Sequence, residues 1–125
     1  MAKKILVVDD DRSLVKIVES KLQGAGYEVI TAHDCVTGLQ RVAEETPDLV
    51  VLDIMMPGMD GTRMGEIMHN DRMTRRIPII FLSAILTKEE AALTGHVLAN
   101  DLILAKPFDG DELLAMIQNV FQDRE

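Results

Sequence analysis

The sequence predicts an α/β fold, in which five strands form a parallel sheet that helices cover on both faces in a doubly wound arrangement. Two observations support this prediction. Short apolar runs alternate five times with stretches of helical periodicity. The strand segments are apolar at nearly every position, as expected of parallel strands, which are buried on both faces. With 125 residues and no repeat, linker or low-complexity stretch, residues 1–125 are expected to form a single domain.

The first unit begins with the apolar run Ile5–Val8, which ends on the three aspartates Asp9–Asp11. The apolar residues then recur at the spacing of a helix, with Asp11 placed to cap its start. Gly24 and Gly26 end this helix, because glycine readily adopts the backbone conformation of a helix C-terminus. We expect its inner face to consist of Leu14, Ile17, Val18 and Leu22.

The second unit begins with a strand at residues 27–32. Asp34 is placed to cap the following helix, since aspartate accepts hydrogen bonds from the free amides of the first turn. Pro47 prevents this helix from continuing, because proline has no amide hydrogen to donate. We expect the inner face of this helix to consist of Val36, Leu39 and Ala43.

The third strand, Leu49–Leu52, leads into Asp53 and a loop rich in proline and glycine at residues 57–61. Proline and glycine so close together force a sharp turn. Six of the eight methionines lie between residues 55 and 73, which favours adaptable core filling over a methionine-rich surface for a partner. We expect the inner face of the third helix to consist of Met64, Ile67 and Met68.

The last two strands are expected at residues 78–82 and 102–105. Each precedes a helix whose start has the spacing of a capping box, with Thr or Asp followed three residues later by Glu, at residues 87–90 and 109–112. We expect the inner face of the last helix to consist of Leu113, Ile117, Val120 and Phe121.

All strands but the second end on a polar or charged side chain, and these side chains are Asp9, Asp10, Asp53, Ser83 and Lys106. Parallel strands present their carboxyl ends at a common edge of the sheet, where open α/β sheets bind their ligands. Each residue alone has an ordinary explanation, since an aspartate can form a turn and a lysine can simply be exposed. Their joint placement predicts a functional site.

Three clustered aspartates would repel one another. Two carboxylates about 5 Å apart repel by roughly 3 kcal/mol at an effective dielectric constant of about 20. Lys106 supplies one offsetting charge, and Mg²⁺, a hard cation that prefers oxygen ligands, is the expected second. A carboxylate beside Mg²⁺, a lysine and a hydroxyl suits phosphoryl transfer to Asp53, with Lys106 neutralising the transferred group and Ser83 donating a hydrogen bond to it.

The sequence resembles response regulator receiver domains, the phosphoryl acceptors of two-component signalling. The resemblance lies in Ile5–Asp10, Leu52–Gly61, Ser83–Ala84 and Lys106–Phe108. It implies the flavodoxin-like receiver fold with strand order 2-1-3-4-5. It also implies that a sensor histidine kinase or a phosphotransfer protein phosphorylates Asp53, and that a downstream effector protein responds.

The resemblance further implies the roles of the site residues. Asp10, Asp53 and the backbone carbonyl of Met55 would bind Mg²⁺ directly, and Asp9 would act largely through a bound water. Lys106 and Ser83 would be catalytic, in the roles that the chemistry above indicates.

Three side chains are expected to modulate this activity. Ile103 occupies the position of an aromatic residue that moves with the hydroxyl in receiver domains, so we expect the signal to pass mainly through residues 84–90. In receiver domains, the positions of Met55 and Ile85 flank the path of the water that hydrolyses the acyl phosphate. Because both are apolar here, we expect slow dephosphorylation.

Composition excludes several classes of partner. The formal net charge of −8 argues against binding nucleic acid or anionic membranes, and no apolar run is long enough to span a bilayer. The single cysteine, Cys35, cannot form an internal disulfide, so a reducing compartment and a cytoplasmic location are expected. We expect a monomer or a phosphorylation-dependent dimer.

Two alternative functions remain open. A small Mg²⁺-dependent aspartyl phosphatase would place a second acid where this chain has Met55. A degenerate receiver that binds partners without phosphorylation would lack a site residue, and none is missing here. We expect no turnover enzyme, only self-catalysed phosphorylation and slow dephosphorylation. Because the chain ends after the last helix, we expect a stand-alone receiver. The variant of this expectation is a receiver cut from a larger regulator or hybrid kinase.

Overall fold

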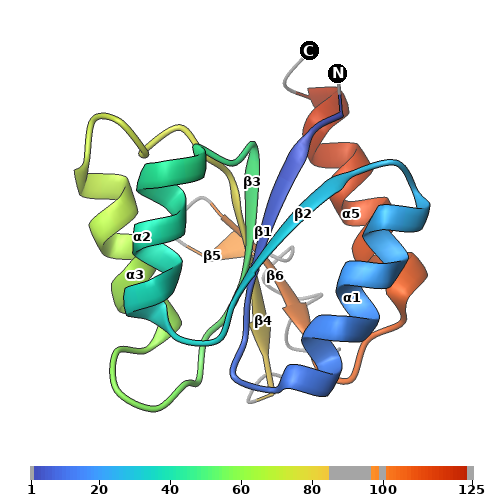
Figure 1. Ribbon diagram of the computed structural model, residues 1–125, viewed down its shortest axis with the longest axis horizontal. Helices are drawn as coiled ribbons and strands as arrows, with labels where there is room; N and C mark the ends of the chain where they lie inside the picture. The colour runs from blue at the N-terminus through green and yellow to red at the C-terminus, as the bar shows by residue number, and fades with distance from the viewer. Residues whose placement is uncertain (1, 85–96, 99–100, 124–125) are drawn as a thin grey trace.

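The computed structural model describes residues 2–84, 97–98 and 101–123 (Figure 1). Its sheet confirms the predicted parallel strands in the order 2-1-3-4-5. These strands are β1 (Lys4–Val8), β2 (Glu28–Ala32), β3 (Leu49–Asp53), β4 (Ile79–Ser83) and β6 (Asp101–Ala105). The sheet also has a sixth strand, β5 (Val97–Leu98), which pairs antiparallel with β6 at the edge. Two residues are too few to form a recognisable strand pattern, so the sequence did not predict β5.

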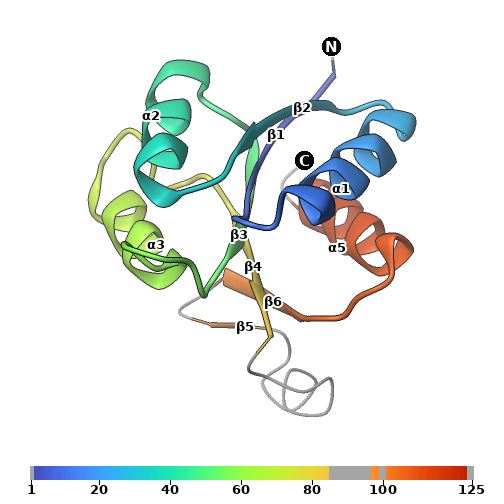
Figure 2. The same ribbon diagram turned by 60° about the horizontal axis from the view of Figure 1, so that its bottom comes forward.

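Helices cover both faces of the sheet (Figures 1 and 2). On one face lie α1 (Arg12–Gly24) and α5 (Gly110–Asp123), and on the other lie α2 (Cys35–Glu45) and α3 (Gly61–Asn70). The helix expected to start near Thr87 lies outside the described residues. Within the described part of the chain, no helix is both long enough and apolar enough to cross a membrane.

Aspartates cap the starts of helices, as predicted for Asp11 and Asp34. Asp11 and Asp34, together with Asp60, each accept hydrogen bonds of 2.7–3.1 Å from amides in the first turn of the following helix. At the start of α5, the amide of Asp109 donates to Glu112 Oε1 at 3.0 Å, which confirms that capping box. Each such cap contributes about 1 kcal/mol to stability.

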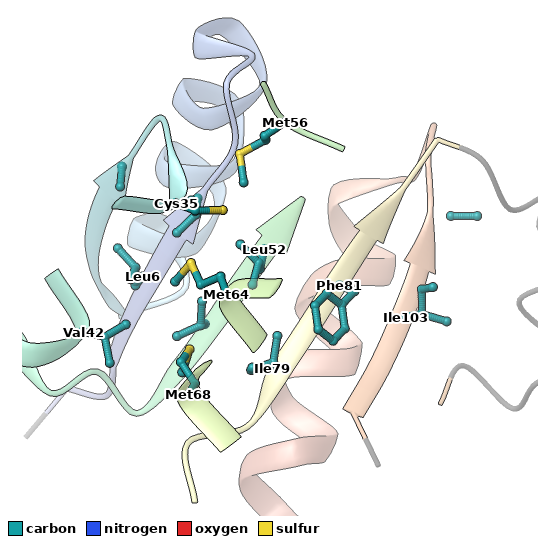
Figure 3. Packing of buried hydrophobic residues seen from close by; sticks show 14 residues of the cluster. Leu6, Cys35, Val42, Leu52, Met56, Met64, Met68, Ile79, Phe81 and Ile103 are labelled. Carbon is teal, nitrogen blue, oxygen red and sulfur yellow. The ribbon is translucent and has the colours of Figure 1, made fainter. Parts of the chain in front are cut away.

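Two apolar clusters fill the space between the sheet and its helices. In the cluster under α2 and α3, Met64 and Met68 of α3 pack with Leu52 of β3 and with Phe81 of β4 (Figure 3). Met64 and Met68 are fully buried and serve as core filling, as expected, whereas Met55 and Met73 of the same stretch are exposed. The second cluster lies under α1 and α5, and includes Leu22, Leu113 and Phe121.

The predicted inner faces of the first two helices are partly wrong. Ile17 of α1 is 67% exposed and Val36 of α2 is 58% exposed, and Ala43 of α2 is exposed as well. Gly38 explains the second error: a β-carbon there would approach Met64 and Val8 to 3.1–3.2 Å, so α2 packs closely through a residue with no apolar side chain. The buried positions are Val15, Val18 and Leu22 of α1, and Cys35, Gly38 and Val42 of α2.

Gly61 closes the loop between β3 and α3 against the end of β3. Its amide donates to the carbonyl of Ile54 at 2.8 Å, and a β-carbon on it would overlap the backbone oxygen of Asp53. Gly61→Ala should therefore destabilise the protein by about 3 kcal/mol, in the upper part of the range for overpacking. Urea unfolding measures this. Gly24→Ala is the matched control, because a β-carbon there meets nothing within 4 Å. Equal stabilities of the two variants would contradict the prediction.

Candidate functional site

The carboxyl edge of the sheet brings together the side chains that the sequence singled out. Asp9 and Asp10 directly follow β1, Asp53 and Ser83 are the last residues of β3 and β4, and Lys106 directly follows β6. The structure buries Asp9, Asp53 and Ser83, which are 0%, 3% and 1% exposed, and leaves Asp10 exposed. Charged groups buried this deeply require compensating partners.

Lys106 is the cationic partner in this site. Its Nζ lies 2.9 Å from Asp9 Oδ2 and 3.5 Å from Asp53 Oδ1. The amide of Lys106 donates to the carbonyl of Ser83 at 2.7 Å, which ties the ends of β6 and β4 together. The Lys106–Pro107 peptide bond is cis. The side chain of Lys106, which follows β6, therefore links Asp9 at the end of β1 to Asp53 at the end of β3.

The aspartates differ in how many hydrogen bonds and ion pairs their side chains make. Asp9 Oδ1 accepts from the amide of Asp11 at 3.0 Å, and its Oδ2 accepts from Lys106. By contrast, no hydrogen bond or ion pair with another described residue holds the side chain of Asp10. Asp9 is therefore held at both of its carboxylate oxygens, and Asp10 has the side chain most open to a further ligand.

Burial and neighbouring charge act on the ionisation of this cluster. Burial, followed by the negative charge of Asp9, raises the pKa of Asp53, while Lys106 opposes the rise. Burial lowers the pKa of Lys106, but its hydrogen bond to Asp9 and the charges of Asp9 and Asp53 outweigh this, so the net shift is upward. The lysine is accordingly charged, and one lysine does not fully offset the carboxylates.

The donor set fits a hard divalent cation. Asp9, Asp10 and Asp53 each offer a carboxylate oxygen, and these atoms lie within 4.8 Å of one another. Carboxylate oxygens are the protein ligands that Mg²⁺ prefers. A cation bound here would also supply the positive charge that the buried Asp53 lacks. The observed arrangement thus suits Mg²⁺ in both chemistry and charge.

The residues expected to modulate the site have different surroundings. Met55 is 56% exposed, two residues beyond Asp53. Ile103 is 1% exposed and pairs in register with Phe81, so it is a fixed part of the core under the helices (Figure 3). Ile85 and most of the expected signalling segment at residues 84–90 lie outside the described residues.

Sequence reasoning missed His33. Its ring Nδ1 lies 3.2 Å from the backbone oxygen of Asp9, at the same edge of the sheet. The position of His33, immediately after the second strand, was the signal that could have revealed it, since every other strand end at this edge carries a site residue.

Comparison with protein families matches the response regulator receiver domain to residues 5–118. The chain is 38% identical over 120 residues to response regulator PleD of Caulobacter vibrioides, which covers 96% of this chain and 26% of PleD. It is 36% identical over 125 residues to the alkaline phosphatase synthesis transcriptional regulatory protein PhoP of Bacillus subtilis, which covers all of this chain and 51% of PhoP. The chain therefore spans about a quarter to a half of these relatives.

Solved structures show the same similarity. A response regulator from Chloroflexus aurantiacus J-10-fl matches with a TM-score of 0.83 and 32% identity, over 96% of this chain and 98% of that chain. The chemotaxis protein CheY4 of Vibrio cholerae matches with a TM-score of 0.83 and 31% identity, over 96% of this chain and 99% of that chain. The fold and the order of its strands are thus those of proteins similar to this chain in sequence.

Proposed function

This chain belongs to the response regulator receiver domains of two-component signalling, and from that premise we propose that it accepts a phosphoryl group on Asp53 in a Mg²⁺-dependent reaction that switches partner binding. One observation carries the proposal. Asp53 is a nearly buried carboxylate at the end of β3, within 3.5 Å of the lysine ammonium and beside two further aspartates. A solvated turn residue would have no such partners.

Each side chain has a proposed role in the transfer. A carboxylate oxygen of Asp53 forms the new bond to phosphorus while the bond from phosphorus to the donor histidine nitrogen breaks and returns its electron pair to that nitrogen. Lys106 neutralises charge on the transferred group. The hydroxyl of Ser83 donates a hydrogen bond to one of its oxygens.

The metal would be held by Asp10, Asp53 and the backbone carbonyl of Met55, with Asp9 acting largely through a water. Bound there, Mg²⁺ would supply positive charge against the phosphoryl oxygens. The observed contacts support this division of roles, because Asp9 already accepts hydrogen bonds at both oxygens whereas Asp10 does not. Asp9 then chiefly holds Lys106 in place.

The proposed partners follow from the family. The phosphoryl donor is a sensor histidine kinase or a phosphotransfer protein, and a downstream effector protein binds the phosphorylated form. The chain itself acts as a monomer or as a phosphorylation-dependent dimer. The chain catalyses only its own phosphorylation and slow dephosphorylation. Residues 1–125 act as one receiver unit, whether alone or within a larger regulator.

Labelling by a small phosphodonor tests the proposal. With Mg²⁺ and phosphoramidate, the intact mass should show a single phosphoryl adduct, and a chelator should abolish it. Asp10→Ala should slow labelling by at least about a hundredfold, because losing a metal ligand weakens the site more than losing its supporting contacts does. Asp11→Asn is the control, since asparagine also caps α1 and should be labelled like wild type.

Two results would refute the proposal. Labelling that proceeds equally with a chelator would exclude the metal. Steady consumption of the phosphodonor with no adduct would instead favour the aspartyl phosphatase alternative, since a phosphatase releases its phosphoryl group at every turnover.

A further inference from the structure

His33 directly follows β2, at the point where the hydrogen bonds between β1 and β2 reach the site. The register of the two strands pairs Val8 with Ala32, and the ladder continues one step further, with the amide of Asp9 donating to the carbonyl of Ala32 at 3.2 Å. In a parallel ladder the bonds are evenly spaced, so the next donor would be the amide of Asp34, and its acceptor the carbonyl of Asp9. The ladder therefore reaches the peptide that links Asp9 to Asp10.

The His33 side chain takes the place of that backbone donor. Among the described residues no backbone bond joins Asp34 to Asp9, because the chain turns there and Asp34 caps α2. Instead, the Nδ1 of His33 lies 3.2 Å from the Asp9 backbone oxygen. A carbonyl oxygen can only accept, so Nδ1 carries the proton and donates.

With this contact, every polar group of Asp9 has a hydrogen-bond partner. Its amide, its carbonyl and both of its carboxylate oxygens each have a partner. The side chain of Asp10 has no comparable anchor among the described residues, so its direction depends on the peptide plane between Asp9 and itself. Whatever holds the Asp9 carbonyl therefore also aims the Asp10 carboxylate.

We propose that His33 is a positioning residue for the metal site, which aims Asp10 by holding the Asp9 carbonyl through its ring N–H. The inference rests on the proposed function, since it assigns Asp10 to the metal. His33 touches neither the metal nor the phosphoryl group in this role. It acts as the partners behind metal ligands do, by fixing the orientation of the ligand.

Three variants separate the hydrogen bond from the bulk of the ring. His33→Phe keeps a ring but has no donor, and His33→Ala removes both. His33→Asn places an amide nitrogen at the same position along the side chain as Nδ1, so it can restore the donor. Because His33 is only half-buried, none of these changes opens a cavity in the core.

The experiment is a titration of each unphosphorylated protein with Mg²⁺ by calorimetry, followed by labelling with phosphoramidate at low and saturating Mg²⁺. The Kd for Mg²⁺ should rise about tenfold in the Phe and Ala variants, which is the lower end of the loss of metal affinity when a partner behind a ligand is removed. In the Asn variant the Kd should rise less than about threefold. Labelling of the Phe and Ala variants should be slow at low Mg²⁺ and return to near the wild-type rate at saturation.

The outcomes distinguish the inference from the function on which it rests. If wild type neither binds Mg²⁺ nor is labelled, both fail. If wild type does both and the Phe and Ala variants bind Mg²⁺ equally well, or if the Asn variant is as impaired as they are, His33 is not a positioning residue and the proposed function stands.

Discussion

Asp53→Asn should not be phosphorylated at all under conditions that fully label the wild type. An amide nitrogen or oxygen is a poor nucleophile towards phosphorus and a poor ligand for Mg²⁺, so the substitution removes the acceptor and one metal ligand together. Intact mass after incubation with Mg²⁺ and phosphoramidate measures the effect. Asp60→Asn is the matched control, because it lies in the same loop and asparagine caps α3 as aspartate does.

The same substitution should stabilise the fold at neutral pH. Folding raises the pKa of Asp53, chiefly through burial and the charge of Asp9, so the folded protein disfavours the carboxylate. Its unfavourable contribution therefore appears as the pH rises above the unfolded pKa and is complete above the folded pKa. The substituted amide would carry no charge at any pH, so thermal unfolding should show a higher midpoint for the variant at pH 7 and little difference at about pH 3.

Labelling of Asp53→Asn to the wild-type extent would overturn the assignment of the acceptor. A lower midpoint at pH 7 would show instead that the attraction between Asp53 and Lys106 exceeds the penalty of burying the carboxylate. The two measurements are independent, since the first reports chemistry and the second reports folding.

Phosphorylated protein should lose its phosphoryl group slowly, and Met55→Asn with Ile85→Glu should accelerate the loss on the order of ten- to a hundredfold. Hydrolysis requires a water that attacks phosphorus in line, opposite the Asp53 oxygen. Met55 is exposed beside the acceptor and has no group that could orient this water by a hydrogen bond. The amide of Asn at position 55 and the carboxylate of Glu at position 85 would supply such groups. Both side chains would also hinder the water less than the apolar side chains, because they are smaller or better hydrated.

The decay of the phosphoryl adduct, followed by mass after the phosphodonor is removed, measures this effect. Met73→Asn is the control, because this methionine is 85% exposed and lies in the connection between α3 and β4, away from the carboxyl edge. Decay in the double variant that is equal to or slower than in the wild type would contradict the role of the two side chains.

Local pattern predicted most of the fold. The apolar runs that became β1, β3 and β4 are buried at nearly every position, and such runs are recognisable without any knowledge of their neighbours. The same holds for helix starts at Asp11, Asp34 and Asp109, because a capping side chain bonds within its own first turn. Ile17 and Val36 were misplaced because each helix offers several apolar residues, and only packing against the sheet selects the buried stripe.

The sequence by itself determined that a site exists and which side chains enter it. These side chains lie at the ends of strands or directly after them, and they are Asp9, Asp10, Asp53, Ser83 and Lys106. Parallel strands direct their carboxyl ends to a common edge, so convergence follows from the order of elements alone. Only the tertiary structure decided how these groups pair. Lys106 lies closer to Asp9 than to Asp53, and His33 holds the Asp9 carbonyl. These contacts join residues far apart in the chain, and their distances depend on strand register and twist, which no local pattern encodes.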